Sequence, residues 1–317
     1  MTTFSETIAR MKGKRNLVLC HDQADSDAIG AAYGVARLIG GDVGVPLAVA
    51  THAQRLIEEL ELRVLIAPEV HTYEHVIVVD AAAPAQLKGS MPARFWFIDH
   101  HPENTLQQSA VAGLYDKVSS TCQLVYRLLK ERGMKLDRKL GLALAAGIMT
   151  DTINFHKGDA EAFRTFGEIL QECGLTYEEI QRLYMVDERD DRGAICEAAI
   201  QAQKNTFNGF HVLVTEIEQN IPTFAARALF DLGADVSVVG YAHDEEVEIR
   251  MYLRQELAEQ YKIDAAEVFR ELPGMENGTA WGYSLFAGYR AKGELSVLLP
   301  AIVEKFEELL MQGKQGK

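Results

Sequence analysis

The stretch HDQADSDAIG, residues 21–30, directly follows the apolar run NLVLC at residues 16–20, and this junction decides the fold. A short apolar run that passes through polar residues into an amphipathic segment is typical of a strand that feeds a helix. The rhythm continues, because VPLAVA (45–50) precedes another amphipathic segment, and HVIVVD (75–80) and FWFID (95–99) are further strand-like runs. The alternation predicts an α/β fold with a doubly wound, mostly parallel sheet that is covered on both faces.

Helical patterns dominate the middle of the chain, and a second alternation of strands and helices follows them. Four amphipathic segments between residues 119 and 185 predict helices at the C-terminal side of the first domain. Residues 186–206 open with a charge run and continue as a mixed helix, which is typical of a helical linker. We therefore predict a first domain over residues 1–185, this linker, and a smaller α+β domain over residues 207–317.

Charge and composition restrict the partners. The 32 basic and 46 acidic residues leave a net charge of −14, so long duplex nucleic acid should be repelled unless a basic patch or bound metal reverses the field. The four cysteines show no CxxC or Cys/His finger spacing, which indicates reduced thiols. No apolar run has the length of a signal peptide or a membrane span, so we expect a cytoplasmic protein without a membrane partner.

Acidic and histidine side chains stand at or just after the ends of the predicted strands and of one apolar helix: His21, Asp25, Asp27, Asp80, Asp99, His100, His101 and Asp151. Taken alone, Asp27 could equally be a helix N-cap and His21 an ordinary loop histidine. The carboxyl ends of parallel strands lie along one sheet edge, however, so we expect these side chains to gather there. This inventory exceeds the three protein ligands of a catalytic zinc, and two divalent ions that share a bridging carboxylate fit it better.

Other chemistries lack their sequence motifs. The chain has no GxSxG elbow, no CxxC and no P-loop GxxxxGK(S/T), so serine hydrolase, thiol redox and nucleotide kinase activities are not expected. Water activated by metal remains as the nucleophile.

Four segments resemble the sequential motifs of the DHH phosphoesterase superfamily: HDQADSDAIG (21–30), VVDAA (78–82), IDHH (98–101) and AAGIMTDT (145–152). That superfamily includes RecJ exonucleases, oligoribonucleases (nanoRNases), dinucleotide phosphodiesterases, exopolyphosphatases and manganese inorganic pyrophosphatases. The resemblance is to the RecJ-like and nanoRNase-like members, and it implies two Mn²⁺ ions per site, with Mg²⁺ or Co²⁺ as alternatives.

The same resemblance implies a role for each residue of the predicted site. His21 and Asp25 would hold one ion, Asp27, His100 and Asp151 would hold the other, and Asp80 would bridge them. Asp99 would orient a histidine. His101 would face the scissile phosphate as a charge stabiliser or proton donor.

The C-terminal domain resembles the DHHA1 domain more weakly. That domain carries a Gly-Gly-Gly-His motif, but here Tyr283 stands in the place of the histidine and only Gly282 remains of the glycines. Arg254 and Arg250 are candidate phosphate contacts, with a solvent-facing strand arginine as the alternative. Trp281 and Tyr283 could stack a base, although an aromatic pair beside glycine is more often part of a core or an interface.

From these features we expect a metal-dependent phosphoesterase that hydrolyses short oligonucleotides, cyclic dinucleotides or adenosine 3′,5′-bisphosphate between its two lobes. An inorganic pyrophosphatase or exopolyphosphatase is the alternative enzyme, disfavoured because the Lys-rich C-terminal signature of manganese pyrophosphatases is missing. A non-catalytic nucleotide-binding regulator is the alternative of another class. The true substrate, the direction of cleavage, the oligomeric state (a homodimer is one option) and the effect of the altered residues 280–283 stay open.

Overall fold

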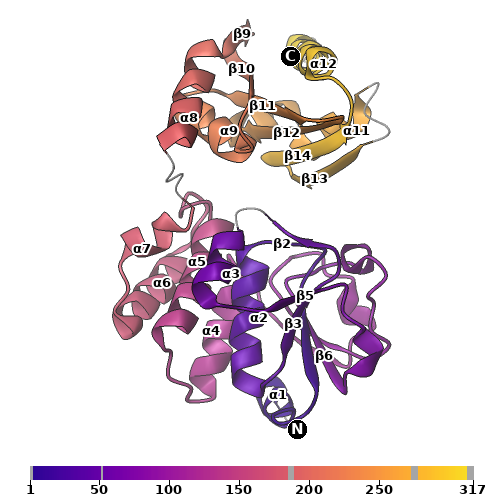
Figure 1. The fold of residues 1–317 in the computed structure, drawn as a ribbon, viewed down its shortest axis with the longest axis vertical. Coiled ribbons are helices and arrows are strands. Elements are labelled where there is room, and N and C mark those ends of the chain that lie inside the picture. Colours follow the sequence, from indigo (N-terminus) through magenta and orange to yellow (C-terminus); the bar gives the residue numbers. More distant parts are fainter. Residues whose placement is uncertain (1–2, 51–52, 185–188, 273–277, 313–317) are drawn as a thin grey trace. The chain divides into compact units, whose positions relative to one another are not determined.

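The computed structural model describes residues 3–50, 53–184, 189–272 and 278–312, and the chain divides into two units, Met1–Met185 and Val186–Lys317 (Figure 1). The division falls where the sequence predicts the end of the first domain. By this division, the predicted linker over residues 186–206 falls within unit 2. Helix α8 (Arg189–Gln201) packs into unit 2 through an apolar face that includes Ala198, and strand β9 begins at Gln203.

Unit 1 is built on a six-stranded parallel sheet in the order β5-β3-β1-β6-β7-β8. Its strands are β1 (Asn16–Leu19), β3 (Asp42–Val45), β5 (Val64–Ile66), β6 (His75–Val79), β7 (Trp96–Asp99) and β8 (Ala112–Tyr115), and β2 (Gln23–Ala24) pairs separately with β4 (Ala48–Val49). From β1 the chain moves outward to β3 and β5, and it then continues on the other side with β6, β7 and β8. The order therefore reverses between β1 and β6, and sheets of this kind bind ligands at such a point.

The α-helices of unit 1 pack on one face of this sheet (Figure 1), in a core that includes Val18, Ile77 and Ile98. They are α1 (Phe4–Ala9), α2 (Ser26–Ile39), α3 (Gln54–Leu60), α4 (Thr121–Glu131), α5 (Arg138–Asp151), α6 (Ala160–Cys173) and α7 (Tyr177–Arg182). The other face, which includes Leu17 and Phe97, packs against short 3-10 segments: η2 (Val70–Thr72), η3 (Pro84–Leu87) and η4 (Leu106–Gln108).

The α/β fold with a doubly wound, mostly parallel sheet is thus confirmed, and both faces are covered, one by α-helices and the other by 3-10 segments. Right-handed crossovers in opposite directions from β1 must lie on opposite faces. The connections after β6 and β7 contain Pro84, Gly89 and Pro92 or are short, so they form turns and 3-10 segments instead of α-helices. The strand predicted at VPLAVA is displaced. Strand β3 ends at Val45, because Pro46 cannot donate a ladder hydrogen bond.

Helices α2, α4 and α5 approach one another unusually closely. A Cβ atom added to Gly30 would lie 2.4 Å from the carbonyl oxygen of Ala143, and one added to Gly147 would lie 2.4 Å from Sγ of Cys122. Only glycine at these two positions permits the contact. The close packing brings the N-termini of α2 and α4 together with the C-terminal part of α5.

Unit 2 is a six-stranded mixed sheet in the order β13-β14-β12-β11-β10-β9. Its strands are β9 (Gln203–Phe207), β10 (Phe210–Ile217), β11 (Val236–His243), β12 (Glu246–Leu253), β13 (Thr279–Tyr283) and β14 (Phe286–Lys292). One face packs against α10 (Gln255–Tyr261), α11 (Ala265–Glu271) and α12 (Leu295–Gln312), and the other against α8 and α9 (Pro222–Asp231). The predicted second α+β domain is confirmed. Among the described helices, none is both long and apolar enough to span a bilayer.

Candidate metal centre

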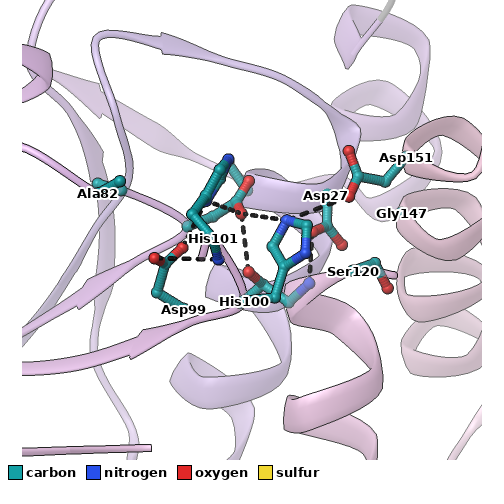
Figure 2. Close-up of polar contacts among 12 residues, drawn as sticks. Asp27, Ala82, Asp99, His100, His101, Ser120, Gly147 and Asp151 are labelled. Atoms are coloured by element: carbon teal, nitrogen blue, oxygen red, sulfur yellow. Dashed lines mark hydrogen bonds and ion pairs between the residues drawn. The ribbon is translucent and has the colours of Figure 1, made fainter. Parts of the chain in front are cut away.

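The Asp and His side chains predicted from the sequence meet where β1, β6 and β7 end, beside the close junction of α2, α4 and α5 (Figure 2). Their ligand atoms form three overlapping groups, and within each group they lie within 4.8 Å of one another: His21, Asp25 and Asp80; Asp27, His100 and Asp151; Asp80, His100 and His101. Asp80 belongs to two groups that include different histidines. This is the arrangement that a ligand shared by two ions requires.

Asp80 follows β6 in a backbone conformation that favours glycine, with a φ of 56°. Its amide donates a hydrogen bond to the carbonyl oxygen of Ile98 at 3.0 Å, which fixes the turn. One carboxylate oxygen lies 3.9 Å from Nε2 of His21, and the other lies 3.7 Å from Nε2 of His100 and accepts the hydroxyl hydrogen bond of Thr121 at 2.7 Å. Left-handed backbone at a non-glycine residue stores strain, as is common at functional sites.

Asp25 and Asp27 have different hydrogen-bond partners, and these partners show that Asp25, not Asp27, is the N-cap of the helix. Asp25 is the N-cap of α2, because its Oδ1 accepts hydrogen bonds from the amides of Asp27 and Ala28 at 3.0 Å each. Asp27 is buried, and its carboxylate instead accepts hydrogen bonds from the amides of Thr121 at 2.6 Å and Cys122 at 3.0 Å, at the start of α4. An N-terminal helix dipole thereby offsets part of its charge.

The two adjacent histidines differ in what holds them. Nδ1 of His100 lies 3.1 Å from the carbonyl oxygen of Val118, so this nitrogen carries the proton, and Nε2 lies 3.2 Å from Oδ2 of Asp151. Such a hydrogen bond orients a metal-binding imidazole. Nδ1 of His101 lies 2.7 Å from Oδ1 of Asp99. Figure 2 shows the two rings side by side, with Asp99 on one side and Asp27 and Asp151 on the other.

The buried carboxylates of the cluster would be stabilised by bound cations. Burial raises the pKa of Asp27, Asp80 and Asp151, and nearby carboxylates raise these pKa values further. Burial opposes protonation of His101, but Asp99 and Asp80 outweigh it and raise the pKa of that imidazole to about 9. Buried carboxylates that repel one another are costly without a compensating charge. Carboxylates mixed with imidazoles suit Mn²⁺ and similar divalent ions, so the residues present fit a metal centre.

Residues 15–148 match the model of the DHH family, N-terminal domain. Unit 1 therefore contains a DHH-family N-terminal domain. This DHH chain is 22% identical over 300 residues to an uncharacterized protein of Methanocaldococcus jannaschii, and the match covers 90% of each chain. It is 26% identical over 172 residues to the A-adding tRNA nucleotidyltransferase of Aquifex aeolicus, covering 53% of this chain and 21% of that protein.

A solved structure resembles both units of the DHH chain. The crystal structure of an exopolyphosphatase-related protein from Bacteroides fragilis matches with a TM-score of 0.73 and 16% sequence identity. The match covers 95% of this chain and 93% of that one. At this level of identity the likeness shows that the fold is shared.

Two residues of the DHH site were not predicted from the sequence. Thr121 binds Asp80 through its hydroxyl and Asp27 through its amide, and the paired Ser120-Thr121 at a helix start was the signal that could have revealed it. Asn104 donates a hydrogen bond to Asp99 at 2.7 Å. No local pattern marks Asn104, because its importance depends on a loop that folds back.

Apart from His101, which lies in unit 1, the residues predicted for substrate binding lie in unit 2. Arg254 donates hydrogen bonds to the carbonyl oxygens of Phe230 at 2.7 Å and Ala234 at 3.1 Å, so two of its donor nitrogens anchor the end of α9, and its predicted contact with phosphate stays a prediction. Arg250 pairs with Glu248 at 2.9 Å and lies 4.9 Å from the ring centroid of Trp281.

The altered glycine motif lies on strand β13 of unit 2. Gly282 has a φ of 121°, a conformation that only glycine adopts easily. The side chain of Tyr283 lies outside the described residues.

Proposed function

We propose that this DHH protein is a two-metal phosphoesterase that uses Mn²⁺ to hydrolyse a small nucleotide phosphodiester or phosphomonoester. The observation that carries the proposal is the position of Asp80, whose two carboxylate oxygens face different histidines at 3.9 and 3.7 Å. The DHH-family domain of unit 1 agrees with a phosphoesterase.

Two sets of side chains would hold the cations. His21 and Asp25 would bind one ion, Asp27, His100 and Asp151 would bind the other, and Asp80 would serve both. When bound, the cations supply Lewis acidity, which makes water more acidic and offsets phosphoryl charge. Mn²⁺ suits this donor set, and Mg²⁺ or Co²⁺ are the alternatives.

His101 is the protein group assigned to the substrate phosphate. Its Nδ1 is held by the fully buried Asp99, while 40% of its own side chain is exposed. Nε2, on the far side of the ring, is therefore the atom that would donate a hydrogen bond to a phosphoryl oxygen or a proton to the leaving oxygen.

We assign recognition of the rest of the substrate to unit 2. The support is the weak resemblance of this unit to DHHA1 domains and the guanidinium of Arg250 over the ring of Trp281. Gly282 and Tyr283 occupy the altered motif, so we expect a preference that differs from that of typical oligoribonucleases.

The experiment is a substrate screen on protein that has been stripped with chelator and dialysed. Mn²⁺ should restore hydrolysis of a 5′-phosphorylated dinucleotide, a cyclic dinucleotide or adenosine 3′,5′-bisphosphate, with pyrophosphate and polyphosphate as comparison substrates. Asp80→Ala should lower the rate more than tenfold, about 1.4 kcal/mol in barrier. Asp116→Ala is the matched control, because Asp116 is an exposed partner of Arg127 that belongs to none of the three ligand groups.

Three other results of this screen would contradict the proposed function. Undiminished turnover in excess chelator would refute the two-metal mechanism. Hydrolysis confined to pyrophosphate or polyphosphate would support the alternative enzyme. Nucleotide binding without any turnover would support a regulator.

A further inference from the structure

Asn104 is a buried amide on the loop that follows β7, with 5% of its surface exposed. Its Nδ2 donates hydrogen bonds to Oδ2 of Asp99 at 2.7 Å and to the carbonyl oxygen of Ala81 at 3.1 Å. Its Oδ1 accepts the amide hydrogen bond of Gln107 at 3.1 Å. Each polar atom of this side chain is thus bonded, so the amide has one defined orientation.

The first of these bonds completes a chain of contacts that ends at His101. Oδ2 of Asp99 accepts hydrogen bonds from Nδ2 of Asn104 and from the amide of His101 at 3.3 Å, while Oδ1 lies 2.7 Å from Nδ1 of His101. A carboxylate held at both oxygens cannot rotate without breaking a bond. The plane of Asp99, and with it the direction of the His101 ring, therefore depends on Asn104.

The second bond connects the two loops that carry the site. Ala81 follows Asp80 directly, so Asn104 ties the loop with the shared carboxylate to the loop with His101. Thr105 strengthens the same connection, because its amide and hydroxyl donate to the carbonyl oxygen of Ala82 at 2.7 and 3.0 Å. Thr105 differs from Asn104 in having no contact with Asp99 among those that the structure describes.

We propose that Asn104 is a positioning residue for the phosphoester reaction. It locks Asp99, so that Asp99 presents His101 to the phosphoryl group at a fixed place relative to Asp80. The proposal rests on the proposed function, in which His101 contacts the substrate phosphate.

The kinetic test is a double-mutant cycle in Mn²⁺, with adenosine 3′,5′-bisphosphate and a 5′-phosphorylated dinucleotide as substrates. Asn104→Ala should lower kcat by about 10–100-fold with little change in KM, as is usual when the partner of an active-site imidazole is removed. Asn104→Ser, which keeps a short donor, should recover part of this loss. In a His101→Ala background, Asn104→Ala should cost nothing further, because both substitutions remove the same contribution.

A spectroscopic arm tests the positioning without turnover. In metal-free protein with ¹⁵N-labelled histidine, the Nδ1 proton of His101 should give a downfield resonance, identified by its absence in His101→Ala. Asn104→Ala should remove or shift this resonance. Glu103→Gln, the matched control at an exposed position of the same loop, should keep it and keep the wild-type kcat.

The outcomes separate the inference from the proposed function. If the wild type hydrolyses none of the probes, the proposed function fails, and the resonance alone decides the role of Asn104. Independent losses in the cycle, an unchanged resonance in Asn104→Ala, or unfolding of both Asn104 variants by circular dichroism would each overturn the proposal.

Discussion

Replacing Gly147 by alanine tests the close helix junction beneath the metal centre. The added Cβ would lie 2.4 Å from Sγ of Cys122 and 2.8 Å from Oδ1 of Asp27, whereas ordinary contacts begin near 3.4 Å. We therefore expect α5 to be displaced by about 1 Å from α2 and α4, a shift typical of an overpacked core. The displaced helix also carries Asp151, so the ligand group of Asp27, His100 and Asp151 should open.

Two opposing terms set the magnitude for Gly147→Ala. Alanine is better than glycine within a helix by about 0.8–1.0 kcal/mol. Overpacking costs about 1–3 kcal/mol, so the net effect should be a loss of stability of up to about 2 kcal/mol. Gly167 in α6 is the matched control, because a Cβ there would meet nothing within 4 Å. Gly167→Ala should therefore gain stability where Gly147→Ala loses it.

Thermal unfolding and manganese titration calorimetry measure the two effects. For a unit of this size, 1 kcal/mol corresponds to about 2–4 °C in Tm, so the two variants should move in opposite directions by a measurable amount. Gly147→Ala should also bind the second Mn²⁺ ion more weakly. If Gly147→Ala raised Tm as Gly167→Ala does, and left the titration unchanged, the reasoning from close packing would be refuted.

Three other substitutions test separate contacts. Thr121→Val removes the hydroxyl bond to Asp80 and should weaken Mn²⁺ binding about 10–100-fold by calorimetry, while Thr121→Ser should bind normally. Asp137→Ala removes the N-cap of α5 and should cost about 1 kcal/mol in urea unfolding near neutral pH. Burial raises the pKa of Asp137, but the hydrogen bond from Arg37 outweighs it and leaves that pKa lowered. The stabilisation by ionised Asp137 is therefore present above the ordinary carboxyl pKa range, and the difference in unfolding free energy between wild type and Asp137→Ala should shrink as acid protonates Asp137. Lys262→Gly relieves a left-handed residue at the end of α10, with a φ of 53°, and should stabilise unit 2 by about 1 kcal/mol, whereas a loss would mean that the side chain matters more than the backbone.

Local patterns in the sequence were sufficient to predict that most of the Asp and His side chains of the candidate metal centre lie close together. The runs HVIVVD and FWFID contain buried strands, one followed directly by Asp80 and the other ending at Asp99. Parallel strands end at a common edge, so the meeting of these side chains followed from topology. The positive φ of Asp80 has no such signature, because aspartate gives no local sign of a left-handed turn. The bonds from Thr121 to Asp27 and from Asn104 to Asp99 depend on where distant loops return.

Arg254 in unit 2 shows the same difference between local structure, which the sequence predicts, and long-range contacts, which it does not. The alternation of EVEIRMYLR correctly predicted strand β12. It did not predict that the guanidinium of Arg254 would reach the carbonyl oxygens at the end of α9, because that contact depends on the packing of a helix 20 or more residues away.

The hydrogen bond between Asp27 and the amide of Thr121 joins residues 94 positions apart, and this separation has a consequence for folding kinetics. Closing a loop of this length costs chain entropy before the hydrogen bond forms. We therefore expect this hydrogen bond to form late in folding. A partly folded chain that has formed β1, β6 and β7 would already hold His21, Asp25 and Asp80, but it would still lack the docked α4 and α5. A cation that needs both ligand groups binds only after that docking, and ligands that bind the native state alone stabilise it by mass action. Mn²⁺ should then lengthen the lifetime of the folded protein by slowing its unfolding, with little effect on how fast it folds.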